Sequence, residues 1–315
     1  MQLSLNITNY SWPGGPAEIG RHLERVARAA DEGGLDTVWV SDHLLQADPN
    51  SSLDEAMLEA YTTLGFLAAR TERIRLGTMV TGVTFRPAGL LIKAVTTLDV
   101  LSGGRAWLGV GAGYQQDEAR AMGLPLPPVA ERFERLDETL RLATRMWAGD
   151  DAPFHGDHYR LEHPINSPPA ISEPRPRILV GGMGERKTLR LVARYADACN
   201  LFDIPDGGRT VRRKLAVLEE HCVVVGRPYD DIERTLSTRL TPGESADSFV
   251  ERCAALASLG IEHAVVITAG PWTEDAVAVL ASAVPALRDT IAGGGEGNWP
   301  RAERPTRRHD QSPPK

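Results

Sequence analysis

Short apolar runs alternate along the chain with longer segments in which apolar residues recur every three to four positions. The short runs are rich in β-branched and aromatic residues and predict strands, whereas the longer segments predict amphipathic helices. The expected strands cover residues 3–8, 37–41, 74–81, 105–111, 177–181, 197–202, 232–240 and 264–268. The expected helices cover residues 17–33, 54–70, 87–101, 130–147, 185–195, 210–225, 247–259 and 274–291. The pattern therefore contains eight strand–helix units.

Sustained alternation of strands and helices predicts a parallel sheet with helical crossovers. Eight such units favour an α/β fold with a single (β/α)8 TIM barrel over residues 1–292, and an open doubly wound sheet is the alternative. Residues 148–175 are rich in Gly, Pro, His and Asp, so we expect a long excursion before the fifth strand. Residues 293–315 begin with glycines and continue with prolines and mixed charges, which predicts a disordered tail.

Composition narrows the class of protein. The 35 basic residues do not balance the 42 acidic ones, and a net charge of −7 argues against a nucleic-acid partner. The amino-terminal residues lack a signal-peptide pattern, and no apolar run approaches the roughly 18 residues of a membrane span. The cysteines Cys199, Cys222 and Cys253 are odd in number and widely spaced, which suits neither a disulfide framework nor a zinc cluster. We expect a cytoplasmic protein that acts on a small molecule, without a membrane partner.

Two glycine-rich segments follow expected strands. In a (β/α)8 barrel the carboxyl ends of the strands carry the active site. Residues 181–184 (Gly-Gly-Met-Gly) are followed by Arg186 and Lys187, and amides at a helix start beside two cations favour a bound phosphate. A tight turn that needs positive φ is the alternative. Residues 109–113 (Gly-Val-Gly-Ala-Gly) fit a thin backbone wall beside a flat ligand.

His43 directly follows the strand expected at residues 37–41. A histidine there could carry a proton near neutral pH, or it could be a loop histidine with satisfied partners beside a capping Asp42. Arg86 is expected in a surface salt bridge and Glu59 as a solvated helix carboxylate. Three further histidines lie in the excursion without the spacing of metal ligands, so we expect no metal site. They are His155, His158 and His163.

Several sequence blocks carry a more specific signal. Residues 41–43 read Ser-Asp-His, residues 76–80 read Leu-Gly-Thr-Met-Val, and residues 102–111 read Ser-Gly-Gly-Arg-Ala-Trp-Leu-Gly-Val-Gly. Together with residues 181–193, they resemble the bacterial luciferase-like monooxygenase superfamily, most of all its branch that uses the deazaflavin coenzyme F420. The resemblance runs from the first expected strand to about residue 200 and is weaker beyond. It implies a (β/α)8 barrel.

The resemblance also assigns roles to individual positions. It places a non-proline cis peptide at Met79–Val80 behind the cofactor ring, and it makes His43 the first candidate for proton transfer and Tyr114 the second. The sugar-phosphate dehydrogenases of the superfamily carry glutamate at the position of Tyr114, which leaves the substrate open. The positions that the resemblance assigns to cofactor binding are Asp42, His43, Met79, Val80, Thr81, Ala112, Gly113, Gly181, Gly182, Met183 and Gly184.

Four functions follow from these observations. The first is an F420-dependent oxidoreductase that moves a hydride between C5 of the deazaflavin and a small organic substrate. The second is an FMN-dependent monooxygenase that receives reduced flavin from a separate flavin reductase. The third is a barrel that binds flavin or F420 without turnover, and the fourth is a cofactor-free hydrolase or aldolase, against which the sequence blocks argue. The resemblance implies a homodimer, and we expect Phe154, His155 and Tyr159 of the excursion to border the substrate.

Overall fold

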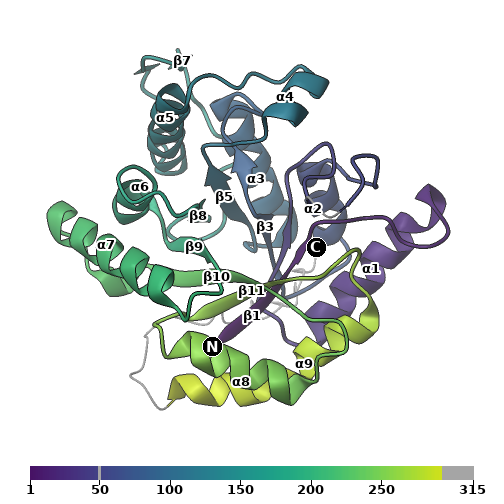
Figure 1. The fold of residues 1–315 in the computed structure, drawn as a ribbon. Coiled ribbons are helices and arrows are strands. Elements are labelled where there is room, and N and C mark those ends of the chain that lie inside the picture. The colour runs from purple at the N-terminus through teal and green to yellow at the C-terminus, as the bar shows by residue number, and fades with distance from the viewer. Residues whose placement is uncertain (49–50, 293–315) are drawn as a thin grey trace, which may run out of the picture.

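Parallel strands occupy the centre of the molecule and helices surround them (Figure 1). The structure is a computed structural model and describes residues 1–48 and 51–292. The strands of the main sheet follow the order β3-β2-β1-β11-β10-β9-β8-β5-β4. The amide of Leu76 on β3 donates to the carbonyl of Arg105 at 2.9 Å, and Leu76 also pairs with Ala106 directly before β5. The sheet therefore closes into a barrel.

The strand bounds match the expected repeat. In chain order the strands of the barrel are β1 Gln2–Ile7, β2 Thr37–Val40, β3 Arg75–Thr78, β4 Thr81–Gly82, β5 Trp107–Gly111, β8 Arg177–Gly181, β9 Ala198–Phe202, β10 Glu233–Arg239 and β11 His263–Ile267. β3 and β4 are separated only by Met79 and Val80, whose peptide bond is cis, as the resemblance implied. Because both lie beside β5, they occupy one place in the barrel, and the (β/α)8 expectation is confirmed.

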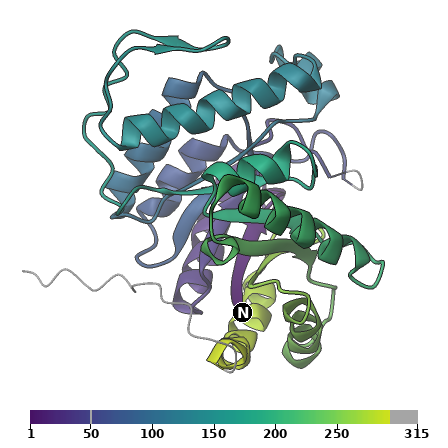
Figure 2. The same ribbon diagram turned by 90° about the vertical axis from the view of Figure 1, so that its left-hand side faces the viewer.

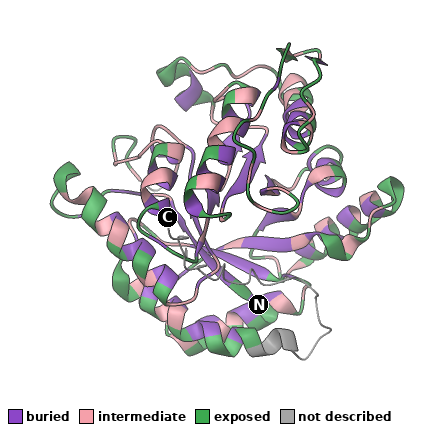
Figure 3. Ribbon diagram, turned by 180° about the vertical axis from the view of Figure 1, so that it is seen from behind, coloured by how far each residue is buried: buried purple, intermediate pink, exposed green. Residues whose placement is uncertain are grey.

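Helices cover the outside of the barrel. Their bounds are α1 Pro16–Glu32, α2 Ala60–Ala68, α3 Ala88–Ser102, α4 Gln116–Met122, α5 Val129–Trp147, α6 Thr188–Tyr195, α7 Arg209–Val225, α8 Ala246–Ala257 and α9 Glu274–Ala292. Figure 3 shows the strands buried and the helices exposed along their outer faces. The main hydrophobic core therefore lies between the barrel and its helices.

A second, smaller cluster fills the inside of the barrel. Trp39 and Trp107 lie at its centre, with ring centroids 5.5 Å apart, and Met79 and Val80 pack against it. Gly77 makes room for both indoles, because a Cβ there would lie 2.7 Å from Trp39 and 2.8 Å from Trp107. The barrel is thus a packed core with Met79 and Val80 near its carboxyl end, which we call the mouth.

Three segments differ from the expectations. The helix expected from residue 54 begins only at Ala60, because the preceding loop is tied to the segment after β1 through a hydrogen bond from Tyr10 N to Ala56 O. α4 was not predicted. The excursion contains a hairpin of β6 Phe154–His155 and β7 Arg160–Leu161, which projects beside α5 (Figure 2). The tail expected to be disordered lies outside the described residues, and none of the described helices could cross a membrane.

Candidate active site

The loop after β2 brings Asp42 to the mouth, where its side chain is closed to solvent. Thr81 Oγ1 donates to Asp42 Oδ2 at 2.7 Å. Arg86 grips both carboxylate oxygens, with Nη1 2.5 Å from Oδ2 and Nη2 3.0 Å from Oδ1. The carboxylate of Asp42 is therefore fully used by the protein and holds the segments after β2 and β4 together.

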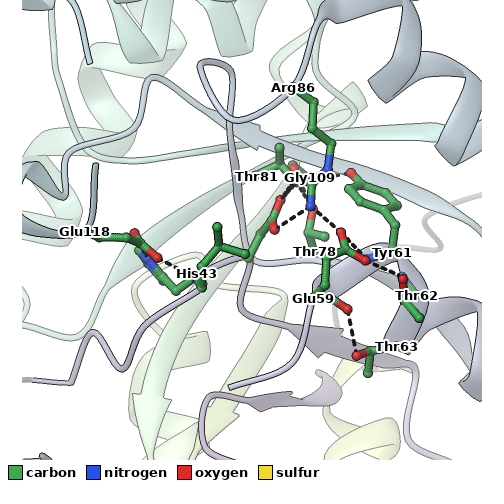
Figure 4. A network of polar contacts seen from close by, with 12 residues as sticks. His43, Glu59, Tyr61, Thr62, Thr63, Thr78, Thr81, Arg86, Gly109 and Glu118 are labelled. Carbon is green, nitrogen blue, oxygen red and sulfur yellow. Dashed lines mark hydrogen bonds and ion pairs between the residues drawn. The ribbon is translucent and has the colours of Figure 1, made fainter. Parts of the chain in front are cut away.

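Arg86 also pairs with Glu59, the residue before α2 (Figure 4). Glu59 caps α2 by accepting from the amides of Tyr61 and Thr62 at 3.2 and 2.7 Å. Burial opposes ionisation of Glu59, but hydrogen bonds from Thr62 and Arg86 outweigh it and lower the pKa of this carboxyl. The expectation of a surface salt bridge for Arg86 was wrong, because its guanidinium is only 14% exposed and joins two carboxylates from separate loops. Glu59 is half-exposed, as a solvated carboxylate would be, but it is also paired with Arg86.

A chain of hydroxyl groups continues from Asp42 into the barrel wall. Tyr61 OH lies 3.1 Å from Thr81 Oγ1, and Thr81 Oγ1 lies 3.1 Å from Thr78 Oγ1. Thr78 in turn donates to the carbonyl of Gly109 at 2.7 Å. Burial and the charge of Asp42 raise the pKa of Tyr61, so it stays a neutral donor. These bonds fix the wall on both sides of Met79 and Val80.

His43 points away from this network and meets a carboxylate from α4 (Figure 4). Its Nδ1 lies 2.8 Å from Glu118 Oε2, and Glu118 Oε1 accepts from the amides of Leu44 and Leu45. Burial opposes ionisation of Glu118, but the hydrogen bond from His43, the charge of the imidazole when it is protonated, and the amides of Leu44 and Leu45 lower the pKa of the carboxyl. Sequence reasoning missed Glu118. Its place just after the glycine segment 109–113 was the available signal.

Aromatic rings border His43. The ring centroids of Phe85 and Tyr114 lie 6.4 and 5.8 Å from the imidazole, both edge-on. Tyr114 is 67% exposed, so a large part of this residue is accessible to a ligand. The structure thus brings both predicted proton-transfer residues together at the mouth.

The glycine turn after β8 offers unpaired donors. Gly182 has φ +114°, a conformation that favours glycine. Within the described residues, the amides of residues 183–187 donate no hydrogen bond. The side chains of Arg186 and Lys187 form no ion pair there either, and Lys187 lies over the ring of Phe133 at 5.4 Å. These donors and cations fit the anion expected from the sequence, and the binding itself stays a prediction.

The glycines of β5 serve the wall itself. A Cβ on Gly109 would lie 1.7 Å from the carbonyl oxygen of Thr78, and one on Gly111 would lie 3.0 Å from Val80 Cγ2. A Cβ on Gly181 would also approach Val80, at 2.9 Å. Val80 therefore lies between the two glycine-rich segments, and both segments approach its side chain at the mouth.

The positions expected to bind a cofactor all lie at or near the carboxyl ends of β2, β3, β4, β5 and β8. Their roles stay predictions. Of the excursion residues expected to border the substrate, Phe154 is buried and stacks with Arg141 and Arg145, so it belongs to the core. Tyr159 reaches the carbonyl of Val83 at 3.5 Å, whereas His155 is exposed on the hairpin.

Comparison with known proteins identifies the family. The model of the luciferase-like monooxygenase family matches residues 1–294. The chain belongs to the luciferase-like monooxygenase family. At this level it is an oxidoreductase of the luciferase-like family. An F420-dependent glucose-6-phosphate dehydrogenase of Kineococcus radiotolerans is 33% identical over 246 residues, which are 76% of this chain and 69% of the relative.

Two solved structures share the fold. An F420-dependent secondary alcohol dehydrogenase in complex with an F420–acetone adduct superimposes with a TM-score of 0.77 at 18% identity, over 91% of this chain and 99% of that chain. The monooxygenase RslO1 from Streptomyces bottropensis gives 0.64 at 24% identity, over 93% and 82%. At these identities the two neighbours establish the barrel and not the cofactor.

Proposed function

We propose that this luciferase-like protein is an F420-dependent oxidoreductase that transfers a hydride to or from a small organic molecule. The observation that carries the proposal is the identity of 33% with an F420-dependent dehydrogenase over 76% of the chain. The arrangement of the mouth supports it. A donor-rich turn, a backbone wall and a histidine–carboxylate pair converge there.

The residues present fit a flat ligand with a phosphate group. The free amides of residues 183–187, with Arg186 and Lys187, provide the donors and the positive charge that a phosphate needs. Met79 and Val80 provide an apolar floor above the packed interior of the barrel. F420, when bound, supplies the hydride donor or acceptor at C5 of its ring.

The residues of the chain orient the reactants and transfer the proton. His43 Nε2 is the atom that gives a proton to the substrate or takes one from it, since Nδ1 is engaged by Glu118. Phe85 and Tyr114 contact the imidazole edge-on and border it at the mouth. The ion pair of Asp42 and Arg86 fixes the loop that carries His43 against the segment after β4. Neither residue contacts the reacting atoms.

Paired titrations with F420 and with FMN test the cofactor. Binding is followed by quenching of tryptophan fluorescence, because Trp39 and Trp107 lie in the cluster that packs against Met79 and Val80. We expect F420 to bind at micromolar or lower concentration and FMN much more weakly. The reverse order would favour the FMN-dependent monooxygenase, and binding of neither would contradict the site.

A glycine variant tests the phosphate turn. Gly182→Ala forces a side chain into φ +114° and should displace the turn, which would weaken F420 binding about tenfold. Gly149→Ala is the matched control, because Gly149 also has positive φ but lies in a loop with no atom within 4 Å of the new Cβ. Equal affinities of the two variants would place the phosphate elsewhere.

A further inference from the structure

A buried carboxylate on α4 controls the orientation of His43. We infer that Glu118 is a positioning residue that fixes the neutral imidazole of His43 with its hydrogen on Nδ1, so that Nε2 faces the mouth as a proton acceptor. The role of this tautomer in catalysis rests on the proposed function, whereas the assignment of the tautomer rests only on the contacts of Glu118. The inference also extends the site to a helix that the sequence pattern did not predict.

The hydrogen bonds of Glu118 define which groups donate. Glu118 Oε1 accepts from the amides of Leu44, at 2.5 Å, and Leu45, at 3.2 Å, while Oε2 lies 2.8 Å from His43 Nδ1. An ionised carboxylate only accepts hydrogen bonds. The nitrogen that faces it must therefore carry a hydrogen. The neutral ring then has its lone pair on Nε2.

The other side of the ring agrees with this assignment. Within the described residues, Nε2 of His43 has no hydrogen-bond partner. It does not belong to the buried polar atoms without a partner, so Nε2 is not closed to solvent. The side chain of His43 is 17% exposed, so this edge is open to a small molecule. Glu118 is only 4% exposed and is reached through the imidazole or the loop backbone.

Among residues 1–48 and 51–292, no second charged side chain forms an ion pair with the imidazole. Asp42, its neighbour in the chain, is held by Arg86 on the far side of the loop. Tyr114 meets the ring edge-on and is neutral at physiological pH. Because Glu118 also holds the backbone at Leu44 and Leu45, one carboxylate fixes both the ring and the loop that carries it. Such orienting partners select the tautomer of catalytic histidines and of metal-binding ones.

Nitrogen NMR of the whole chain with ¹⁵N-labelled histidine rings tests the inference without cofactor. The His43 signals are assigned by their loss in His43→Asn, and spectra are taken at a pH where the ring is neutral. We expect Nδ1 to resonate as a protonated ring nitrogen and Nε2 as an unprotonated one. Wild-type protein with the hydrogen on Nε2 would overturn the inference, whatever the variants do.

Two variants separate positioning from general disturbance. Glu118→Gln keeps the shape but offers both a donor and an acceptor to Nδ1, so the Nε2–H tautomer should rise from a trace to a substantial fraction. Glu134→Gln is the control, because Glu134 pairs with another histidine, His158, at 2.9 Å. It should leave the signals of His43 unchanged. A Glu118→Gln spectrum identical to wild type would overturn the role of Glu118, and failure of F420 to bind would leave this result standing.

Discussion

Asp42 and Arg86 form a two-pronged ion pair that is nearly closed to solvent at the mouth of the barrel. Removing one partner of such a pair leaves the other charge buried and unpaired. We expect Arg86→Gln to lower the free energy of unfolding by about 3 kcal/mol, measured by urea denaturation. Arg21→Gln removes an exposed pair with Glu18 and should cost less than about 1 kcal/mol. Similar losses for both variants would show that the Asp42 pair is solvated.

Gly109 has no room for a side chain. A Cβ there would lie 1.7 Å from the carbonyl oxygen of Thr78, which is a backbone atom of the wall. Gly109→Ala should therefore lower stability by about 3 kcal/mol or more. Gly65→Ala in α2 meets no atom within 4 Å and should raise stability by about 0.5–1 kcal/mol. Thermal unfolding of both variants checks the contrast, and a stable Gly109→Ala protein would contradict the close approach.

The repeat of eight strand–helix units could be predicted because the strands are short apolar runs flanked by polar, glycine or proline residues that interrupt the pattern. β8 is the clearest case, since residues 177–181 lie between a proline-rich segment and a glycine turn and were predicted with the observed bounds. Helices with a long apolar face were predicted to within a few residues. The loop before α2 was not, because its contacts with Tyr10 override a locally helical pattern.

The partner of His43 could not be predicted for a related reason. α4 has only seven residues and is mostly polar, so it lacks the periodic face by which helices are recognised. Glu118 is buried solely because the fold places it beside the loop after β2. Likewise, the meeting of Arg86 with Asp42 and Glu59 depends on three loops at one end of the barrel.

Glu138 on α5 anchors the hairpin of the excursion. Its carboxylate accepts from the amides of Asp157, His158 and Tyr159 at 2.7, 3.2 and 2.9 Å. In Glu138→Ala these amides lose their acceptor, so we expect faster hydrogen exchange in residues 154–161 with the barrel unchanged. Asp137→Ala changes the neighbouring residue of α5, whose carboxylate accepts from Tyr195 OH and not from the hairpin, so it should keep the protection of wild type. Equal exchange in both variants would show that other contacts hold the hairpin.

Glu233 makes stability depend on pH at the opposite end of the barrel. Burial opposes its ionisation, but the hydrogen bond from His263 Nδ1, at 2.6 Å, and the nearby charge of Arg177 hold its pKa well below the usual range. A lowered pKa in the folded state contributes stability above the ordinary carboxyl pKa of about 4.3, and this stability is lost as the pH falls through the lowered value.

Urea unfolding between pH 7 and pH 3 checks this dependence. The free energy of unfolding should fall as the pH is lowered below about 4.3. In Glu233→Gln the fall should be shallower, because the group no longer titrates. Glu32→Gln, an exposed position on α1, should retain the slope of wild type. A Glu233→Gln slope as steep as that of wild type would assign the dependence to other carboxyls.

His43→Ala separates proton transfer from cofactor binding in the proposed reaction. The substitution removes Nε2 at the mouth but leaves the turn at residues 183–187 intact, so affinity for F420 should change little. Turnover with a substrate found by screening should fall by about 10²–10⁴-fold, the usual contribution of a general acid or base. Absorbance of F420 measures turnover, fluorescence titration measures affinity, and His163→Ala in the excursion is the control. Unchanged turnover would remove His43 from the chemistry, whereas a parallel loss of affinity would make it a binding residue.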